Sequence, residues 1–259
     1  PDSGVTEVTA RKPGGATWFL TSDGLEKNFA ALSNAGTQVA AFTSDAAYYG
    51  KLVVYNLESP EPTRIGSVYN TQTHQFPRAL EWSPDDTKLA FPMALKDGRD
   101  ALYITPSDFS APATELLRIS TGHRIWAYHW SPDGQQIAYI WSETKGAPGT
   151  NQQAISVVNL ATGQTRVVHQ FGLYDGRSLD VGWSPDGTKL RFTRTALGNN
   201  GALLEVPANA SAPAAVIYQT PGIPFQGRAF SPDGLWIYAD VTGSRFYAPI
   251  ANPADRTPL

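Results

Sequence analysis

Repeated aspartates are the first candidates for chemistry in this sequence. Asp85, Asp133, Asp186 and Asp233 each follow a Ser-Pro pair and precede glycine or, in one copy, a second aspartate. Proline sets the first corner of a turn, and aspartate accepts hydrogen bonds from the backbone beyond it. Each carboxylate belongs to a separate turn, too far from the others to share a proton or a metal ion. We predict that all four cap turns.

Two other acids fit a different chemistry, because each lies close before a tryptophan in a predicted inner strand. Glu81 directly precedes Trp82, and Asp180 stands three residues before another tryptophan. Glycoside hydrolysis uses two carboxyl groups about 5 to 10 Å apart across a cleft. The pair is therefore the candidate for a glycosidase, while Glu81 is also suited to an ion pair with Arg78 or His129.

Aromatic, arginine and histidine side chains recur in the segments that lead into each first strand, and in loops on the same side. We call this side the lead-in face; tryptophan, tyrosine and arginine are the residues that most often anchor interfaces. The candidate binding residues are His74, Arg78, His123, Arg124, Trp126, Trp141, Tyr174, Arg177, Asp180, Arg194, Phe225, Gln226 and Arg228. The alternative is ordinary loop composition, with the aromatic rings packed between sheets. Trp126 fits both interpretations, with a core position slightly favoured.

Other reactive groups are scarce. His74 and His123 occupy similar positions, but two histidines without a carboxylate at a fixed spacing do not make a metal site. The chain has no cysteine, so disulfides and thiolate ligands are excluded. It also lacks the Gly-x-Ser-x-Gly segment that a serine peptidase of the α/β-hydrolase type requires. We predict no catalytic residue, no metal and no cofactor.

An internal repeat positions these candidates. The segments Trp82 to Phe91, Trp130 to Tyr139 and Trp183 to Phe192 are nearly interchangeable, Phe230 to Ile237 keeps the turn, and Leu32 to Val39 is a degenerate copy. The copies begin at positions 32, 82, 130, 183 and 230, so the spacing is 47 to 53 residues. This is the length of a four-stranded propeller blade. The aromatic residue and the apolar residue seven positions later are expected to point into the layers between blades.

The repeat predicts an all-β fold, with residues 1–259 forming a single β-propeller. Five blades start near residues 26, 76, 124, 177 and 224, and the Ser-Pro-Asp turn joins the first two strands of each. The last copy lacks a recognisable fourth strand after Ile250. Strand-like runs at Val5 to Ala10 and Ala16 to Thr21 are predicted to supply the closing strand. Because they hold one strand too many, six blades remain the alternative.

The run aromatic-Ser-Pro-Asp-Gly followed by an apolar residue resembles the WD40-like repeats of the TolB β-propeller family, over about nine tenths of the chain. Related repeats form the propeller of the prolyl oligopeptidase family. The resemblance implies a protein-binding platform of the bacterial envelope, or a propeller that gates a hydrolase domain. The sequence departs from both, since it contains neither an N-terminal α/β domain nor a hydrolase domain. The shared motif is a turn, so no catalytic residue carries over.

Composition limits the classes of partner that the protein is expected to bind. The net charge is −3 and the isoelectric point about 5.8, which gives no basic footprint for nucleic acid. No apolar run is long enough for membrane insertion. The sequence begins at Pro1 without a leader, as expected of a processed or cut chain. We predict a monomeric, non-enzymatic scaffold, periplasmic or extracellular, that binds a protein or peptide through the lead-in face. The alternatives are a hydrolase, either glycosidase-like or part of a larger peptidase, and a lectin that binds a glycan; a small-molecule ligand also stays open.

Overall fold

A computed structural model describes residues 9–11, 17–19, 26–45, 48–57, 62–66, 74–77, 79–144, 152–172, 178–196, 200–220, 225–241 and 244–258. Every regular element in these ranges is a β-strand, as the repeat predicted. The chain divides into two compact units, residues 1–121 and 122–259, and each is described by itself.

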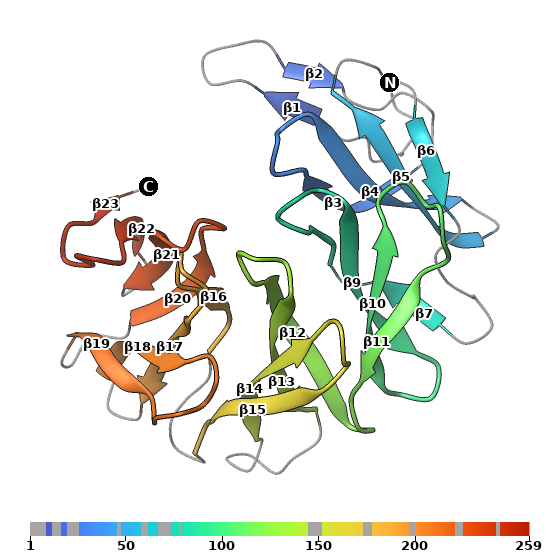
Figure 1. The fold of residues 1–259 in the computed structure, drawn as a ribbon. Coiled ribbons are helices and arrows are strands. Elements are labelled where there is room, and N and C mark those ends of the chain that lie inside the picture. Colours follow the sequence, from blue (N-terminus) through green and yellow to red (C-terminus); the bar gives the residue numbers. More distant parts are fainter. Residues whose placement is uncertain are drawn as a thin grey trace. The chain divides into compact units, whose positions relative to one another are not determined.

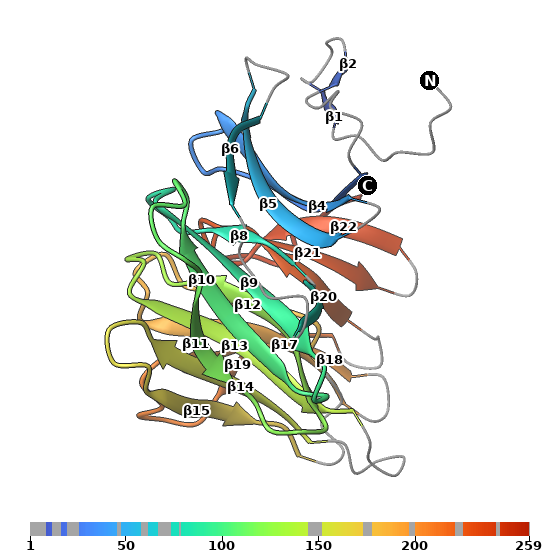
Figure 2. The same cartoon turned by 90° about the vertical axis from the view of Figure 1, so that its right-hand side faces the viewer.

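The first unit contains two complete blades. Blade 1 has the strand order β3-β4-β5-β6, and in blade 2 the order is β11-β10-β9-β7, with β8 also pairing with β9 (Figure 1). Strands β7 and β8 are therefore two halves of one inner strand. Figure 2 shows β4 and β5 curving together across blade 1. The strands are β1 (Thr9–Arg11), β2 (Thr17–Phe19), β3 (Glu26–Leu32), β4 (Gln38–Asp45), β5 (Tyr48–Asn56), β6 (Pro62–Gly66), β7 (His74–Pro77), β8 (Glu81–Trp82), β9 (Lys88–Leu95), β10 (Asp100–Pro106) and β11 (Thr114–Arg118).

The second unit contains three blades of four strands each: blade 3 (β12 to β15), blade 4 (β16 to β19) and blade 5 (β20 to β23). All of their strand pairs are antiparallel, and each strand pairs with the next one along the chain. The strands are β12 (His123–Trp130), β13 (Gln136–Glu143), β14 (Gln153–Asn159), β15 (Thr165–Gln170), β16 (Val181–Trp183), β17 (Lys189–Ala196), β18 (Asn200–Pro207), β19 (Ala215–Thr220), β20 (Phe225–Phe230), β21 (Trp236–Val241), β22 (Ser244–Pro249) and β23 (Thr257–Pro258).

The prediction that an N-terminal strand completes the last blade is wrong. Strands β1 and β2 pair with each other in a separate two-stranded sheet. The fourth strand of blade 5 is β23, whose residues Thr257 and Pro258 pair with β22. A two-residue strand that ends in proline has no alternating pattern, so it could not be predicted from the sequence.

The Ser-Pro-Asp segments form the predicted turns between the first and second strands of the blades. In each turn the serine hydroxyl donates to the aspartate two residues later, at 2.5 Å for Ser184 and Asp186. The same carboxylate accepts the backbone N–H two residues further on, and these bonds lower its pKa, for Asp186 to about 2. Asp86, which replaces glycine, adopts φ 56°, and its carboxylate accepts the amide of Asn34 in the adjacent turn of blade 1. The turn-cap interpretation is confirmed.

The motif tryptophans bury their rings against the preceding blade. Trp82 and Leu89 pack with Phe42 of blade 1, and Trp183 lies in the cluster that blades 3 and 4 share. The indole N–H groups of Trp82 and Trp183 donate across their junctions to a backbone oxygen at the same place in the repeat, Ala31 for Trp82 and His129 for Trp183, both at 3.0 Å. The repeat therefore specifies both the turn and the contact between successive blades.

Candidate functional site

The lead-in end of blade 3 gathers four of the predicted binding residues. These residues lie at the end of the β12–β13 pair that is far from the Ser131–Gln136 turn. The start of β12 carries His123, Arg124 and Trp126, and Trp141 lies near the end of β13. The register pairs His123 with Glu143 and Ile125 with Trp141. We call His123, Arg124, Trp126, Trp141 and Glu143 the blade-3 rim. It places two indoles, a guanidinium, an imidazole and a carboxylate on one strand pair.

Trp126 is aimed outward by a β-bulge. Ile125 pairs with Trp141 and Ala127 with Ile140, so Trp126 is an extra residue with no partner of its own in the ladder. Bulges of this kind re-aim side chains. The Trp126 side chain is 56% exposed, so the slightly favoured core interpretation is wrong. Its indole N–H donates to the hydroxyl of buried Ser142 at 2.5 Å, which fixes the ring and leaves its face for stacking.

The remaining rim residues are ordered by contacts of their own. The rings of His123 and Trp141 meet edge to face, with centroids 5.1 Å apart. His123 Nε2 lies 4.0 Å from Glu143 Oε1, and the indole N–H of Trp141 donates to Ser156 at 3.0 Å. Arg124 is exposed, and no ion pair with it is found among the described residues. The rim therefore offers an accessible cation on the same strand as an exposed indole that a hydrogen bond fixes.

Buried polar contacts hold the rim against blade 4. Gln153, which pairs with Ser142 in the register, donates to the backbone oxygen of Ser178 at 3.0 Å and accepts its amide at 2.8 Å. Ser178 in turn donates through its hydroxyl to the backbone oxygen of Asp180 at 2.8 Å. Gln153 and Ser178 are both buried. Paired buried polar groups of this kind favour one arrangement of the backbone, and here they fix the segment that leads into blade 4.

Asp180 ties three blades together. One carboxylate oxygen lies 2.8 Å from His129 Nε2 in blade 3, and the other accepts the backbone N–H of Phe230 in blade 5 at 3.0 Å. The Asp180 side chain is 8% exposed and that of His129 34%. Asp180 therefore gives His129 a carboxylate partner in blade 4, and the suggested pairing of His129 with Glu81 stays a prediction. Both oxygens of Asp180 are therefore engaged within the protein, and they join blade 4 to blades 3 and 5.

The other predicted binding residues are spread over the two units. In blade 5, Arg228 is again a bulge residue and donates to Asp240 at 2.6 Å. Arg194 is half-buried on β17. His74 belongs to β7, and Phe225 and Gln226 belong to β20. Arg78, Tyr174 and Arg177 lie outside the described residues.

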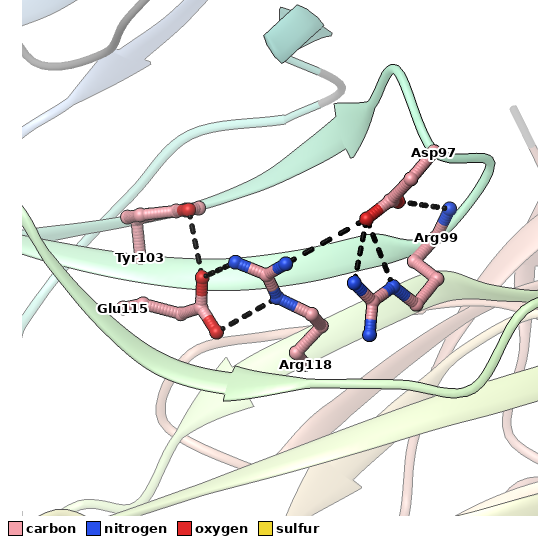
Figure 3. Close-up of polar contacts among 5 residues, drawn as sticks. All are labelled: Asp97, Arg99, Tyr103, Glu115 and Arg118. Atoms are coloured by element: carbon pink, nitrogen blue, oxygen red, sulfur yellow. Dashed lines mark hydrogen bonds and ion pairs between the residues drawn. The ribbon is translucent and has the colours of Figure 1, made fainter. Parts of the chain in front are cut away.

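A charge network on blade 2 was not among the predicted sites (Figure 3). Asp97 accepts two bonds from the guanidinium of Arg99, at 2.6 and 3.0 Å, and lies 3.7 Å from Arg118. Glu115 accepts two bonds from Arg118, at 3.0 and 2.5 Å, and one from the Tyr103 hydroxyl at 2.9 Å. A Glu-x-x-Arg spacing is visible in the sequence, but the partners on other strands are not. The network neutralises its own charges and covers the outer part of the blade.

The network also shifts the pKa values of its members. Burial, followed by the hydrogen bond to Glu115, raises the pKa of Tyr103 to about 12. The bonds from Arg118 hold the pKa of Glu115 below its usual range, and those from Arg99 do the same for Asp97. Burial explains most of the Tyr103 shift and ion pairs explain the shifts of Glu115 and Asp97, so these pKa shifts do not single out a catalytic group.

The described ranges contain neither a cluster of metal-ligand side chains nor a membrane-spanning helix. No group of three or more histidine, aspartate or glutamate side chains in them is arranged to hold a metal ion. They also contain no helix long and apolar enough to cross a bilayer.

Comparisons with known proteins agree with the fold. No family model matches the chain. A stretch of 103 residues, 36% of the chain, is 41% identical to the Tol-Pal system protein TolB of Alcanivorax borkumensis and covers only 22% of that protein. A solved TolB structure from Agrobacterium tumefaciens gives a TM-score of 0.60 at 16% identity, over 94% of this chain and 83% of that one. A prolyl endopeptidase gives 0.61 at 16% identity, over 91% and 36%. The chain has the fold of a TolB-like β-propeller.

Proposed function

We propose that this TolB-like β-propeller is a non-enzymatic scaffold that binds a segment of a partner protein at the blade-3 rim. The observation that carries the proposal is Trp126, 56% exposed yet fixed by its bulge and by Ser142. Large exposed aromatic side chains are costly to keep in water and are enriched at the centres of interfaces. Arg124, two residues earlier on the same strand, supplies the charge that orients a partner.

The rim is organised before any partner arrives, which supports a binding role. The Trp126 indole is fixed by one hydrogen bond and the backbone beneath it by the Gln153–Ser178 pair. A partner would therefore have to order few side chains of the scaffold, and each side chain that is immobilised on association costs about 0.5 to 1.5 kcal/mol. Binding energy at such a rim comes from stacking on the indole face and from a carboxylate or carbonyl on Arg124.

We place the scaffold in the bacterial envelope. Support comes from the relative named as a Tol-Pal system protein, of which the matched stretch spans 22%. The likeness to a prolyl endopeptidase covers 36% of that enzyme and concerns its fold. The engagement of Asp180 by His129 and Phe230 argues against the glycosidase alternative.

Selection from a random peptide library tests the proposal. Peptides are selected on the intact chain, and their affinities are measured for the parent and for Trp126→Ala and Arg124→Ala. We expect each substitution to weaken binding about tenfold or more, a loss of about 1.4 kcal/mol or more. Trp236→Ala is the matched control, since Trp236 is 41% exposed but lies beside the Ser-Pro-Asp turn of blade 5. Equal affinities for Trp126→Ala and the parent would exclude the rim.

A further inference from the structure

The outermost strand of each blade leaves one backbone edge at the end of its sheet. Such edges pair readily with other strands, and proteins protect them with charges, proline or very short strands. Strand β6 contains Pro62 and Arg64, and β23 has two residues, one of them proline. Strand β11 carries Glu115 and Arg118, which form the network of Figure 3. The edges of β6, β11 and β23 are therefore each protected by a charge, a proline or a very short length.

Strand β15 follows the same rule. It contains Arg166, whose guanidinium donates to the backbone oxygen of Ala208 at 2.8 Å and to Gln136 at 2.6 Å. It also exposes an aliphatic side chain, Val167, which is 51% exposed. An exposed aliphatic residue on an outer strand is therefore not unusual in this fold when a cation stands beside it.

Strand β19 breaks the rule. Its sequence, Ala-Val-Ile-Tyr-Gln-Thr, has neither a charged residue nor a proline, and no charged residue stands anywhere between Glu205 and Arg228. Val216 is 47% exposed and Ile217 is 43% exposed. Strand β19 ends the sheet order of blade 4. It is six residues long and uncharged, and three of its residues are β-branched, a composition that favours pairing with another strand.

A bulge does not explain the difference. Ile217 is the extra residue of a bulge in β19, since Leu203 pairs with Tyr218 and Leu204 with Val216. Strands β11 and β15 carry bulges at the corresponding place, and they have charges as well. What distinguishes β19 is the absence of charge from its sequence.

We propose that β19 is a docking edge for β19 of a second copy of this chain, with the two strands antiparallel. The argument for this occupant is the uncharged, self-compatible sequence of β19. A two-fold axis sets the same strand against itself, so uncharged, β-branched side chains meet their equals and no ionised group loses water. If the occupant of the β19 edge were instead a charged strand such as β11, its Glu115 and Arg118 would lose water against uncharged side chains. The proposal is independent of the blade-3 rim, and it departs from the monomer expected from the sequence.

The absence of cysteine makes a direct test available, because one introduced thiol can pair only with its copy. Residues opposite each other in an antiparallel pair have Cα atoms about 4.5 to 5.5 Å apart, within reach of a disulfide. Val216→Cys, Ile217→Cys and Gln219→Cys are oxidised mildly and examined on a non-reducing gel. We expect a disulfide dimer from the position nearest the axis. Val167→Cys, equally exposed on β15, is the matched control and is expected to stay monomeric.

Sedimentation equilibrium of the unmodified chain provides the second measurement. We expect the mass to rise from one chain towards two with concentration, and Ile217→Lys to weaken association at least about tenfold, because like charges that face each other across a strand pair destabilise it. Val167→Lys is expected to leave it unchanged, and circular dichroism checks that both variants fold. A single-chain mass at every concentration, or cross-linking of Val167→Cys as efficient as that of the β19 variants, would overturn the proposal. Association that persists in Ile217→Lys would overturn it too.

Discussion

Removal of the Asp180 carboxylate tests how successive blades are joined. In Asp180→Ala the buried amide of Phe230 loses its acceptor, which was 3.0 Å away, and His129 loses a partner at 2.8 Å. A buried donor left unsatisfied costs about 1 to 3 kcal/mol, and a hydrogen bond to a charged group contributes about 1.5 to 3 kcal/mol. Because the His129 side chain is 34% exposed, water replaces part of the second contribution. We expect Asp180→Ala to lower the free energy of unfolding by about 2 to 4 kcal/mol.

Urea denaturation followed by tryptophan fluorescence measures this loss, and thermal unfolding gives a second reading of about 2 to 4 °C for each kcal/mol in a domain of this size. Asp255→Ala, at an exposed aspartate of blade 5, is the control and is expected to match the parent. A double-mutant cycle with His129→Ala isolates the contribution of the histidine. If Asp180→Ala unfolds at the same urea concentration as Asp255→Ala, Asp180 does not join the blades.

Three further predictions concern packing and protonation. In Gly182→Ala the new Cβ would lie 2.5 Å from Cγ of Phe230, so we expect a loss of about 1 to 3 kcal/mol in urea denaturation, and an unchanged midpoint would contradict the packing of blades 4 and 5. The lowered pKa of Asp186 stabilises the folded state above the ordinary aspartate pKa near 4, and this contribution disappears as the pH falls through about 2. Asp186→Ala should therefore show a smaller fall in melting temperature over that range, and an identical fall would argue against the turn bonds. In Glu115→Gln, ultraviolet titration, with Tyr103→Phe as reference, should give a Tyr103 pKa below about 12 but above its usual value, since burial remains; a pKa that stays at about 12 would rule out the Glu115 contribution.

The sequence predicted the parts of the fold that depend on local chemistry. The turns follow from proline, aspartate and a residue that tolerates positive φ, and Asp86 at φ 56° shows that this reasoning holds where glycine is replaced. The inward direction of Trp82 and Trp183 follows from the same repeat. These features recur at a fixed spacing, so each copy supports the interpretation of the others.

Features that depend on contacts between strands were not predictable in the same way. The bulge that exposes Trp126 is set by the register of β12 against β13, and the spacing of Trp126 from Trp130 gives no sign of it. Asp180 meets His129 from 51 residues away, because both flank an inner-strand tryptophan of successive blades. Strand β23 was missed because pairing, rather than composition, makes Thr257 and Pro258 a strand.

Hydrogen exchange of the intact chain with and without a selected peptide tests the central claim most directly, because it locates the binding surface without any substitution. Binding at the blade-3 rim predicts slower exchange of the amides from His123 to Ala127 and from Trp141 to Glu143, at the lead-in end of β12 and β13. The amides of the Ser131–Gln136 turn, at the other end of the same strands, should be unaffected. Protection confined to that turn, or absent from blade 3, would contradict the claim.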